Sequence, residues 1–232
     1  MKYSTYNAIR NTLYKNKVVL GVYSFFKNKI PNYFKKKKLR ENGFKDLSLL
    51  VQLLEDTDIQ YFCEFGTLLG FIRDKGFIPH DNDIDMGIIN NSFFSWENLE
   101  KQLSRGNIKK VHSYSYEGRI TEETFDFPDG TSIDFFLYDV EEERMITNVY
   151  YKNHNMVYDN ANQRSVKALI YPRISGVTTI SVNENATPIP IPENAETHLE
   201  HIYGPLWRLP DPAYKPDREN DILPNIGQRI DY

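Results

Sequence analysis

The sequence has few of the features that mark exported or membrane-spanning proteins. Its single cysteine, Cys63, excludes a disulfide framework within the chain. The apolar run over residues 18–26 is shorter than the roughly 20 residues that cross a bilayer. Its position and the lack of a small-residue cleavage site also argue against a signal peptide. We therefore expect a cytoplasmic protein.

Acidic residues are missing from one part of the chain. Residues 1–40 contain eleven Lys or Arg and no Asp or Glu, so the remainder carries 17 basic and 32 acidic residues. Aromatic residues lie among these lysines, which suits the surface of an anionic membrane at the inner face of the cell. The alternative is that this arm packs on the body of the protein. Nucleic acid is a weaker candidate, because the acidic body would be repelled. We predict two units, a basic arm over 1–42 and a catalytic domain over 43–232.

A cluster of carboxylates follows in the motif between Gly66 and Ile88. The run from Ile84 to Ile88 predicts a β-strand, whose side chains alternate between faces. Asp83 and Asp85 would then share one face. Paired carboxylates repel each other unless a cation holds them, and oxygen ligands alone favour Mg²⁺ or Mn²⁺ over zinc. The pattern predicts a metal-dependent site of phosphoryl transfer.

A third carboxylate interrupts a later apolar strand. Asp134 lies between Ile133 and Phe135, where an unpaired buried carboxylate would cost several kcal/mol. If this strand lies beside the one that carries Asp83 and Asp85, the three carboxylates converge on one metal site. The alternative is that Asp134 faces solvent at the end of its strand.

These residues belong to a longer pattern that resembles the LicD/fukutin-like family. The pattern consists of Phe65-Gly66-Thr67-Leu68-Leu69-Gly70, Arg73, Gly76-Phe77-Ile78-Pro79, Asp81-Asn82-Asp83-Ile84-Asp85 and the closing segment Tyr203-Gly204-Pro205-Leu206-Trp207 with Pro210. The resemblance implies a nucleotidyltransferase-type fold. It also implies transfer of phosphocholine, ribitol phosphate, glycerol phosphate or a similar phosphoalcohol from a CDP-linked donor to a cell-surface glycan of the capsule, lipopolysaccharide or teichoic acid type. CMP would be released.

The motif suggests a role for each polar residue. Asp83, Asp85 and Asp134 are the predicted catalytic and metal-binding residues, and Asp134 would share a metal and orient the acceptor hydroxyl or accept its proton. Asp81 and His80 are not expected to bind the metal directly. They are expected to orient the loop or the metal-binding residues. His80 stands where many family members have Trp, which affects the expected acceptor or subclass and not the expected chemistry.

A second group of residues is predicted to bind phosphate and substrate. Gly66 and Thr67 would offer backbone N–H groups at the start of a helix. Arg73 and Lys75 are candidates for donor phosphates, although both also suit the surface of an amphipathic helix. Trp207, together with Tyr203 and Arg208, is a candidate for the nucleotide or acceptor pocket, and a structural role for Trp207 is equally plausible.

The rest of the chain predicts an α/β (α+β) fold with a mixed β-sheet flanked by helices. Expected helices cover 44–56, 67–75, 92–103 and 195–201, and expected strands cover 60–65, 84–88, 111–116, 119–127, 132–140 and 145–151. Asp129-Gly130 predicts a hairpin turn. The proline-rich segment 186–232 is expected to wrap the body as extended loops around its short helix.

Two other functions fit the same residues. One is a nucleotidyltransferase that moves a nucleoside monophosphate onto a small molecule or protein, which would leave nucleotide on the product. The other is a non-catalytic protein that binds glycan or nucleotide. The complete set of three aspartates argues against the latter.

Overall fold

The computed structural model describes residues 30–153, 156–182, 187–211 and 225–232. Most of the predicted basic arm therefore lies outside the described residues. The first described element, α3 (Ile30–Leu54), is one continuous helix that crosses the predicted domain boundary at residue 42. The helix expected to begin at Phe44 thus starts much earlier. It brings the lysine-rich end of the arm onto the body.

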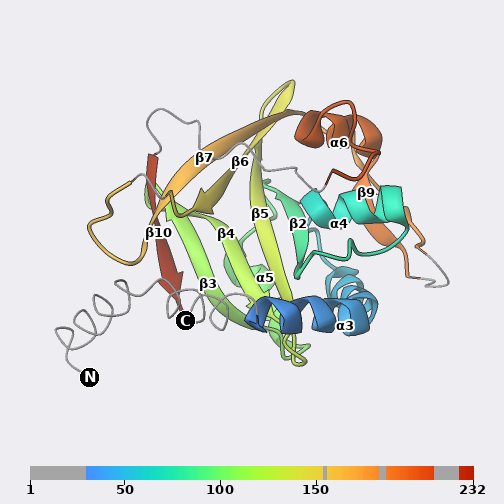
Figure 1. The fold of residues 1–232 in the computed structure, drawn as a ribbon, viewed down its shortest axis with the longest axis horizontal. Helices are drawn as coiled ribbons and strands as arrows, with labels where there is room; N and C mark the ends of the chain where they lie inside the picture. Colours follow the sequence, from blue (N-terminus) through green and yellow to red (C-terminus); the bar gives the residue numbers. More distant parts are fainter. Residues whose placement is uncertain (1–29, 154–155, 183–186, 212–224) are drawn as a thin grey trace, which may run out of the picture.

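An eight-stranded sheet forms the centre of the molecule (Figure 1). Its order is β1-β2-β5-β4-β3-β10-β7-β6, and β6 pairs back to β5. Six strands from β5 to β6 therefore close a barrel, while β2 and β1 extend from β5 as a side sheet. The strands are β1 (Tyr61–Cys63), β2 (Asp83–Ile89), β3 (Lys109–Tyr116), β4 (Arg119–Asp126), β5 (Ser132–Val140), β6 (Arg144–Tyr151), β7 (Gln163–Pro172) and β10 (Asn225–Asp231).

The fold is a mixed α/β fold, as predicted, but its sheet is closed. Among the described strands, β2 and β5 pair in parallel and the other neighbours pair antiparallel. The sequence analysis missed the two strands that close the barrel, β7 and β10. In β7 the exposed positions include Ala168 and Ile170, and in β10 exposed positions fall on both sides, so neither sequence alternates between apolar and polar residues as a half-buried strand does.

The proline-rich segment is only partly a set of loops. Its short helix, α6 (Ala195–Tyr203), is present as expected. Before it, β9 (Ile189–Pro192) pairs with β8 (Val177–Ile180) in a small second sheet, where prolines are tolerated because each strand has a free edge. After it, β10 enters the barrel between β3 and β7. Residues 212–224 lie outside the described part of the chain.

One face of β2 and β5 forms the core. Side chains from alternate positions of these strands are fully or almost fully buried, as strand geometry requires: Ile84, Met86, Ile88, Ile133, Phe135 and Leu137. Helices α3 and α5 (Trp96–Ser104) cover this face with their own buried leucines, namely Leu47, Leu50, Leu54, Leu99 and Leu103. The opposite face of the same strands carries the aspartates at one end, while Phe136 and Tyr138 of β5 join a second buried cluster with Phe62 further along.

Gly66 and Gly70 of the motif lie in a short helix after β1. The helix expected up to Lys75 is present as α4 (Phe65–Leu69) continued by a π-helical turn, η2 (Gly70–Asp74). It ends at Lys75, whose φ of 57° is left-handed. Gly70 allows a close approach here, because a Cβ would lie 2.4 Å from the carbonyl oxygen of Gly76. None of the helices in the described ranges is long and apolar enough to cross a membrane.

Candidate active site

The three predicted catalytic aspartates lie on two neighbouring strands. Asp83 and Asp85 are on β2 and Asp134 is on β5, and the parallel register pairs Asp85 with Asp134 and Asp83 with Ser132. Paired residues of adjacent strands project from the same face, and so do residues two apart on one strand. The condition on which the sequence argument depended, that the two strands are adjacent, is therefore met.

Burial raises the pKa of each carboxylate in this cluster, and repulsion between carboxylates adds to this rise for Asp85 and Asp134. The pKa of Asp85 lies well above its ordinary value because of burial, with further contributions from Asp83 and Asp134. Burial and the charge of Asp83 raise the pKa of Asp134 to about 7, although Thr124 donates a hydrogen bond of 2.5 Å to its Oδ1. Burial also raises the pKa of Asp83, and the amine of Lys35 opposes that shift. The cluster holds more negative charge than its surroundings balance.

Asp81 adds a fourth carboxylate beside the cluster. Burial and the charge of Asp83 raise its pKa to about 7. Its Oδ2 atom is buried and has no hydrogen-bond partner among the described residues. Gly66 makes room for it, since a Cβ at position 66 would lie 2.8 Å from that oxygen. Asp81 therefore touches the motif glycine and has an unused acceptor.

This donor set fits a hard divalent cation in its chemistry. All donors are carboxylate oxygens, which Mg²⁺ and Mn²⁺ prefer, and a cation would relieve both the repulsion and the orphaned oxygen. Within the described residues, no three His, Cys, Asp or Glu side chains already converge on one metal position. The fit therefore rests on the type and burial of the donors. A complete coordination shell would need oxygens from water or substrate, as is usual for Mg²⁺.

The predicted phosphate-binding residues are engaged in other contacts. The buried Thr67 hydroxyl accepts a hydrogen bond of 2.9 Å from the backbone N–H of Asp85, so this side chain holds β2 in place. Arg73 donates two hydrogen bonds of 2.8 Å to the carboxylate of Asp74. Lys75 donates to the carbonyl oxygen of Ile72 at the end of its helix and is exposed. Their contacts hold the loop together.

A cleft of about 1330 Å³ opens beside the carboxylates. It is lined by Gly66, Arg73, Asp81 and Asp85, by the exposed His80 and, on the far wall, by the segment after α6. Of the predicted substrate-binding residues, Gly66, Arg73 and Trp207 thus share one cavity, whereas Thr67 and Lys75 do not line it.

Trp207 belongs to this far wall. Its side chain is 4% exposed, and its indole N–H has no hydrogen-bond partner among the described residues. The backbone carbonyl of Trp207 accepts a hydrogen bond of 3.5 Å from Arg73. Arg208 stacks over the Trp207 ring at 4.3 Å and pairs with Glu196, outside the lining of the cleft. The orphaned N–H is a donor available to a ligand.

A buried polar network next to the start of the motif was not predicted from the sequence. The carboxylate of Glu64, just before Phe65, accepts hydrogen bonds of 3.0 Å from the hydroxyl of Tyr138 and from Nε2 of His198. All three side chains are at most 2% exposed. Because His198 belongs to α6, the network ties the C-terminal helix to the start of the motif. In the sequence, only the position of Glu64 at the end of an apolar strand indicates a buried acid. Its partners could not be predicted, because they are far away in the sequence.

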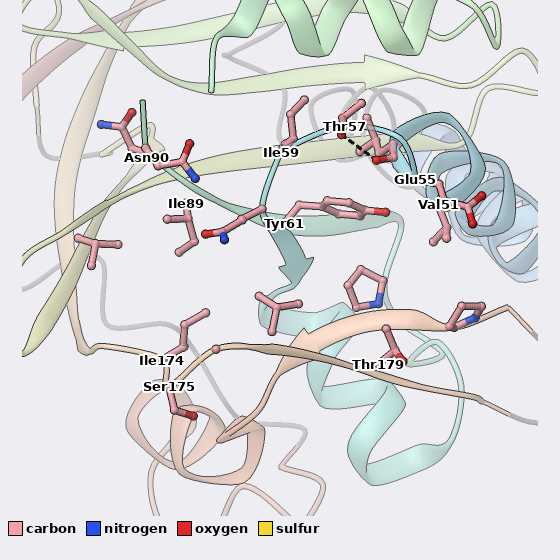
Figure 2. Close-up of a pocket in the computed structure, with 18 of the residues that line it drawn as sticks. Val51, Glu55, Thr57, Ile59, Tyr61, Ile89, Asn90, Ile174, Ser175 and Thr179 are labelled. Carbon is pink, nitrogen blue, oxygen red and sulfur yellow. Dashed lines mark hydrogen bonds between the residues drawn. The ribbon is translucent and has the colours of Figure 1, made fainter. Parts of the chain in front are cut away.

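A second cavity, of about 950 Å³, lies at the other end of β2 (Figure 2). Tyr61, Ile89 and Asn90 line it on one side, and Ile174 and Thr179 face them across the gap. None of the predicted site residues lines this cavity. The two ends of β2 therefore lie at different cavities. Asp81 and Asp85 line the cleft near Trp207, whereas Asp83 and Asp134 line neither cavity.

The protein combines a mixed α/β fold with a cluster of carboxylates that lies on two adjacent strands beside a cleft. Residues 58–174, about half of the chain, match the family described as LicD/FKTN/FKRP, nucleotidyltransferase domain. The chain belongs to the LicD family. The match includes the motif and Asp134 but neither α3 nor the segment that carries Trp207. The family description names a nucleotidyltransferase domain, and it names no donor or acceptor.

Curated relatives extend well beyond the matched region. An uncharacterized protein of Rickettsia prowazekii (strain Madrid E) is 33% identical over 121 residues, which cover 49% of this chain and 42% of the relative. An uncharacterized protein of Rickettsia typhi (strain ATCC VR-144 / Wilmington) is 34% identical over 87 residues, or 34% of this chain and 28% of the relative. The chain thus spans less than half the length of these relatives, and their names give no donor or acceptor.

Proposed function

We propose that the protein is a metal-dependent phosphotransferase that moves a phosphoalcohol from a CDP-linked donor to a hydroxyl of a cell-surface glycan. The observation that carries the proposal is the register of β2 and β5, which places Asp83, Asp85 and Asp134 on one face beside a cleft in a chain of the LicD family. Phosphoryl transfer asks a protein mainly for positioning and charge neutralisation, and this cluster is suited to both.

The aspartates would hold Mg²⁺ or Mn²⁺. When bound, the ion would neutralise charge on the donor diphosphate and on the carboxylates. Asp83 and Asp85 are the primary ligands in this proposal because they come from one strand and project from the same face. Asp81 supports them from the loop, where its unpaired Oδ2 is a further acceptor. His80, exposed at the rim, is assigned no chemical step.

The reaction forms one O–P bond and breaks another. An acceptor hydroxyl oxygen attacks the phosphorus that carries the alcohol, and the bond from that phosphorus to the oxygen of CMP breaks. CMP leaves with the bonding electron pair, and the hydroxyl proton passes to a carboxylate. Asp134 is the proposed acceptor of this proton, because it lies opposite Asp85 on the neighbouring strand and a positioned carboxylate can take a proton from a hydroxyl in the transition state. Thr124 holds the carboxylate in place.

The cleft would bind the donor or the acceptor next to the metal. Trp207 offers an aromatic face and an unpaired N–H, and Arg73 offers its charge once a phosphate competes with Asp74. The backbone N–H groups of Gly66 and Thr67 complete this wall. Both substrates are proposals: a CDP-activated alcohol and a glycan or lipid-linked glycan.

Fold, domains and location are part of the same proposal. We assign β1, β2, β5 and β4 with the α4 turn to a nucleotidyltransferase-type core, supported by the family match over 58–174. Residues 43–232 would act as the catalytic domain. The arm over 1–42 would keep the enzyme at the inner, anionic face of the cell membrane, without binding nucleic acid. The proline-rich wrap is proposed only for the segment around α6.

Titration calorimetry tests this function. CDP-choline, CDP-ribitol, CDP-glycerol and CDP are titrated with and without Mg²⁺ into the wild type, Asp83→Asn and Asp85→Asn, with the exposed loop variant Asp58→Asn as the matched control. We expect Mg²⁺-dependent binding of one CDP-alcohol that both site variants lose and the control keeps. Binding of UTP or ATP in place of every CDP ligand would indicate a nucleotidyltransferase instead. No nucleotide binding at all would refute the proposal.

A further inference from the structure

Lys35, from the basic run that was expected to face a membrane, lies at the carboxylate cluster. Helix α3 crosses the lower ends of β4 and β5 (Figure 1). Its Lys35 Nζ donates a hydrogen bond of 3.2 Å to the hydroxyl of Ser132, a residue 97 positions away in sequence. Ser132 is buried, and it pairs in register with Asp83 and lies two residues before Asp134 on the same face of β5. The amine is therefore at the edge of the site.

The charge of Lys35 acts on the site from this position. It lowers the pKa of both Asp83 and Asp134 against the larger effect of burial. It also contributes, after burial and Arg229, to the lowered pKa of His112, about 4, so that this neighbouring imidazole is neutral at pH 7. Asp126 lies on the same side of the sheet, where Ser132 donates to it at 2.7 Å. Lys35 thus faces Asp83 and Asp134 from α3, while Lys36 of the same helix lowers the pKa of Asp81.

The contacts of Lys35 differ from those of the predicted phosphate binders. Arg73 is held by a carboxylate and Lys75 by a carbonyl oxygen. Within the described residues, Lys35 forms no ion pair within 4 Å, and its hydrogen bond goes to a neutral hydroxyl. Its side chain is exposed, so the four-carbon stem can move. A lysine with a flexible stem and no ion-pair partner is free to bind an incoming anion.

We propose that Lys35 binds a non-bridging phosphate oxygen of the nucleotide donor at the carboxylate cluster. This inference rests on the proposed function and deepens it, because it names the residue that recognises the donor diphosphate. Once a divalent cation neutralises Asp83 and Asp134, the amine is no longer needed there and its charge is available to phosphate. The donor site would then include α3, which lies outside the family match over 58–174.

The same helix supplies a matched control. Lys37 lies two residues along, is exposed, and forms an i,i+4 ion pair of 3.7 Å with Glu41 away from the site. Lys35→Gln and Lys37→Gln remove the same charge from the same basic run. Lys35→Arg keeps the charge at the site with a different head group.

Binding of CDP with Mg²⁺, of cytidine, and of Mn²⁺ alone is measured for these variants by calorimetry and by the Mn²⁺ electron spin resonance signal. We expect Lys35→Gln to weaken CDP binding about tenfold, as for one lost charge-assisted hydrogen bond. Lys35→Arg should recover part of this loss, and Lys37→Gln should show none. Cytidine, which lacks phosphate, should bind all variants equally. Mn²⁺ alone should bind Lys35→Gln at least as tightly as the wild type, because a neighbouring positive charge is gone.

Two results would overturn the assignment. Unchanged CDP affinity in Lys35→Gln, with only tighter Mn²⁺ binding or lower thermal stability, would make Lys35 a structural counter-ion of the aspartates. An equal loss of cytidine and CDP would place it against the base or ribose. A different result would refute the proposed function alone. The wild type would then bind UDP or ADP with Mg²⁺ but not CDP, and Lys35→Gln would lose that binding. Lys35 would still bind phosphate, but the donor would not be CDP-linked. If the wild type binds no nucleotide, both proposals fall.

Discussion

Two buried acids that are neighbours in the fold differ in how the protein treats them. The backbone N–H of Glu64 donates to the carbonyl of Asp85 at 3.0 Å, so the two residues lie side by side. The Glu64 carboxylate accepts hydrogen bonds from Tyr138 and His198. No described residue donates a hydrogen bond to the carboxylate of Asp85. Burial and the neighbouring aspartates raise the pKa of this carboxylate. A satisfied acid stabilises the fold, whereas an unsatisfied one costs stability and is available to a ligand.

The largest effect should come from the unsatisfied acid. Asp85→Asn keeps the size of the side chain and removes the charge that would hold the metal. We expect transfer activity, followed as CMP release, to fall about 1,000-fold or more, in line with losing a principal electrostatic group of a catalytic site. The fold should be unaffected, because the Thr67 contact uses the backbone N–H of Asp85. Activity within tenfold of that of the wild type would remove Asp85 from the site.

The satisfied acid should show the opposite pattern. Glu64→Gln places an amide where the carboxylate now accepts two donors. Breaking such a buried pair costs about 3 kcal/mol of unfolding free energy, measurable by urea denaturation. His198→Gln should cost a similar amount. His201→Gln, on the exposed side of the same helix, should cost almost nothing. If Glu64→Gln is as stable as the wild type but inactive, the network belongs to the chemistry and the comparison fails.

The carboxylate cluster also predicts how stability depends on pH. The pKa of Asp134 is about 7 in the folded protein against 3.8 ordinarily, so its contribution to stability is present below about pH 4 and is lost as pH rises through 7. Asp134→Asn should therefore stabilise the metal-free protein, with a gain that grows between these pH values. At pH 8 we expect a gain on the order of 2 kcal/mol, or roughly 4–8 °C in Tm.

Thermal unfolding in EDTA at pH 5, 6, 7 and 8 measures this gain. Added Mg²⁺ should raise the Tm of the wild type at pH 8 and raise that of Asp134→Asn less. The exposed Asp58→Asn should follow the wild type at every pH. A variant that is less stable than the wild type at pH 8 would show that the Asp134 charge is already compensated.

The smallest effect is expected at the far wall of the cleft. Trp207→Phe keeps an aromatic ring but removes the unpaired N–H together with the five-membered ring of the indole. If a substrate accepts a hydrogen bond from that N–H, its loss should cost about 1 kcal/mol, seen as a several-fold rise in KM at unchanged kcat. Stability should fall modestly in either case, because the smaller ring leaves space in the core cluster to which Trp207 belongs. An unchanged KM together with a lower Tm would indicate that Trp207 only packs.

Local pattern was sufficient for the elements near the motif. The strand predicted over 84–88 was recognisable because its side chains alternate between apolar and other residues. The strand that carries Asp134 was recognisable as an apolar run interrupted by one charge. The turn at Asp129-Gly130 was also predictable: Gly130 has a φ of 85°, and Asp129 Oδ1 accepts from the N–H of Thr131. Strand β10 and the early start of α3 were not predictable in this way, because tertiary contacts and not periodicity favour them.

The site itself was predictable in its residues and less so in their roles. Asp83 and Asp85 share a face for the reason the sequence indicates. The Thr67 hydroxyl and the Lys75 amine each contact a backbone group. Phosphate binding by the N–H groups of Gly66 and Thr67 and by Lys75 stays a prediction. Glu64 could be noticed in the sequence as a charge at the end of an apolar strand. Its partners, Tyr138 and His198, are 74 and 134 residues away, and no local rule connects them.

The sequence by itself determined which faces of β2 and β5 are apolar and which carry carboxylates, because side chains of a strand alternate whatever the surroundings. Only the tertiary structure decided that these strands pair in parallel, with Asp85 opposite Asp134. The same is true of the closure of the barrel through β10 and of the contact between Lys35 and Ser132, which are 97 positions apart. Such contacts depend on which long-range arrangement buries the most apolar surface, and that choice is made by the whole chain at once.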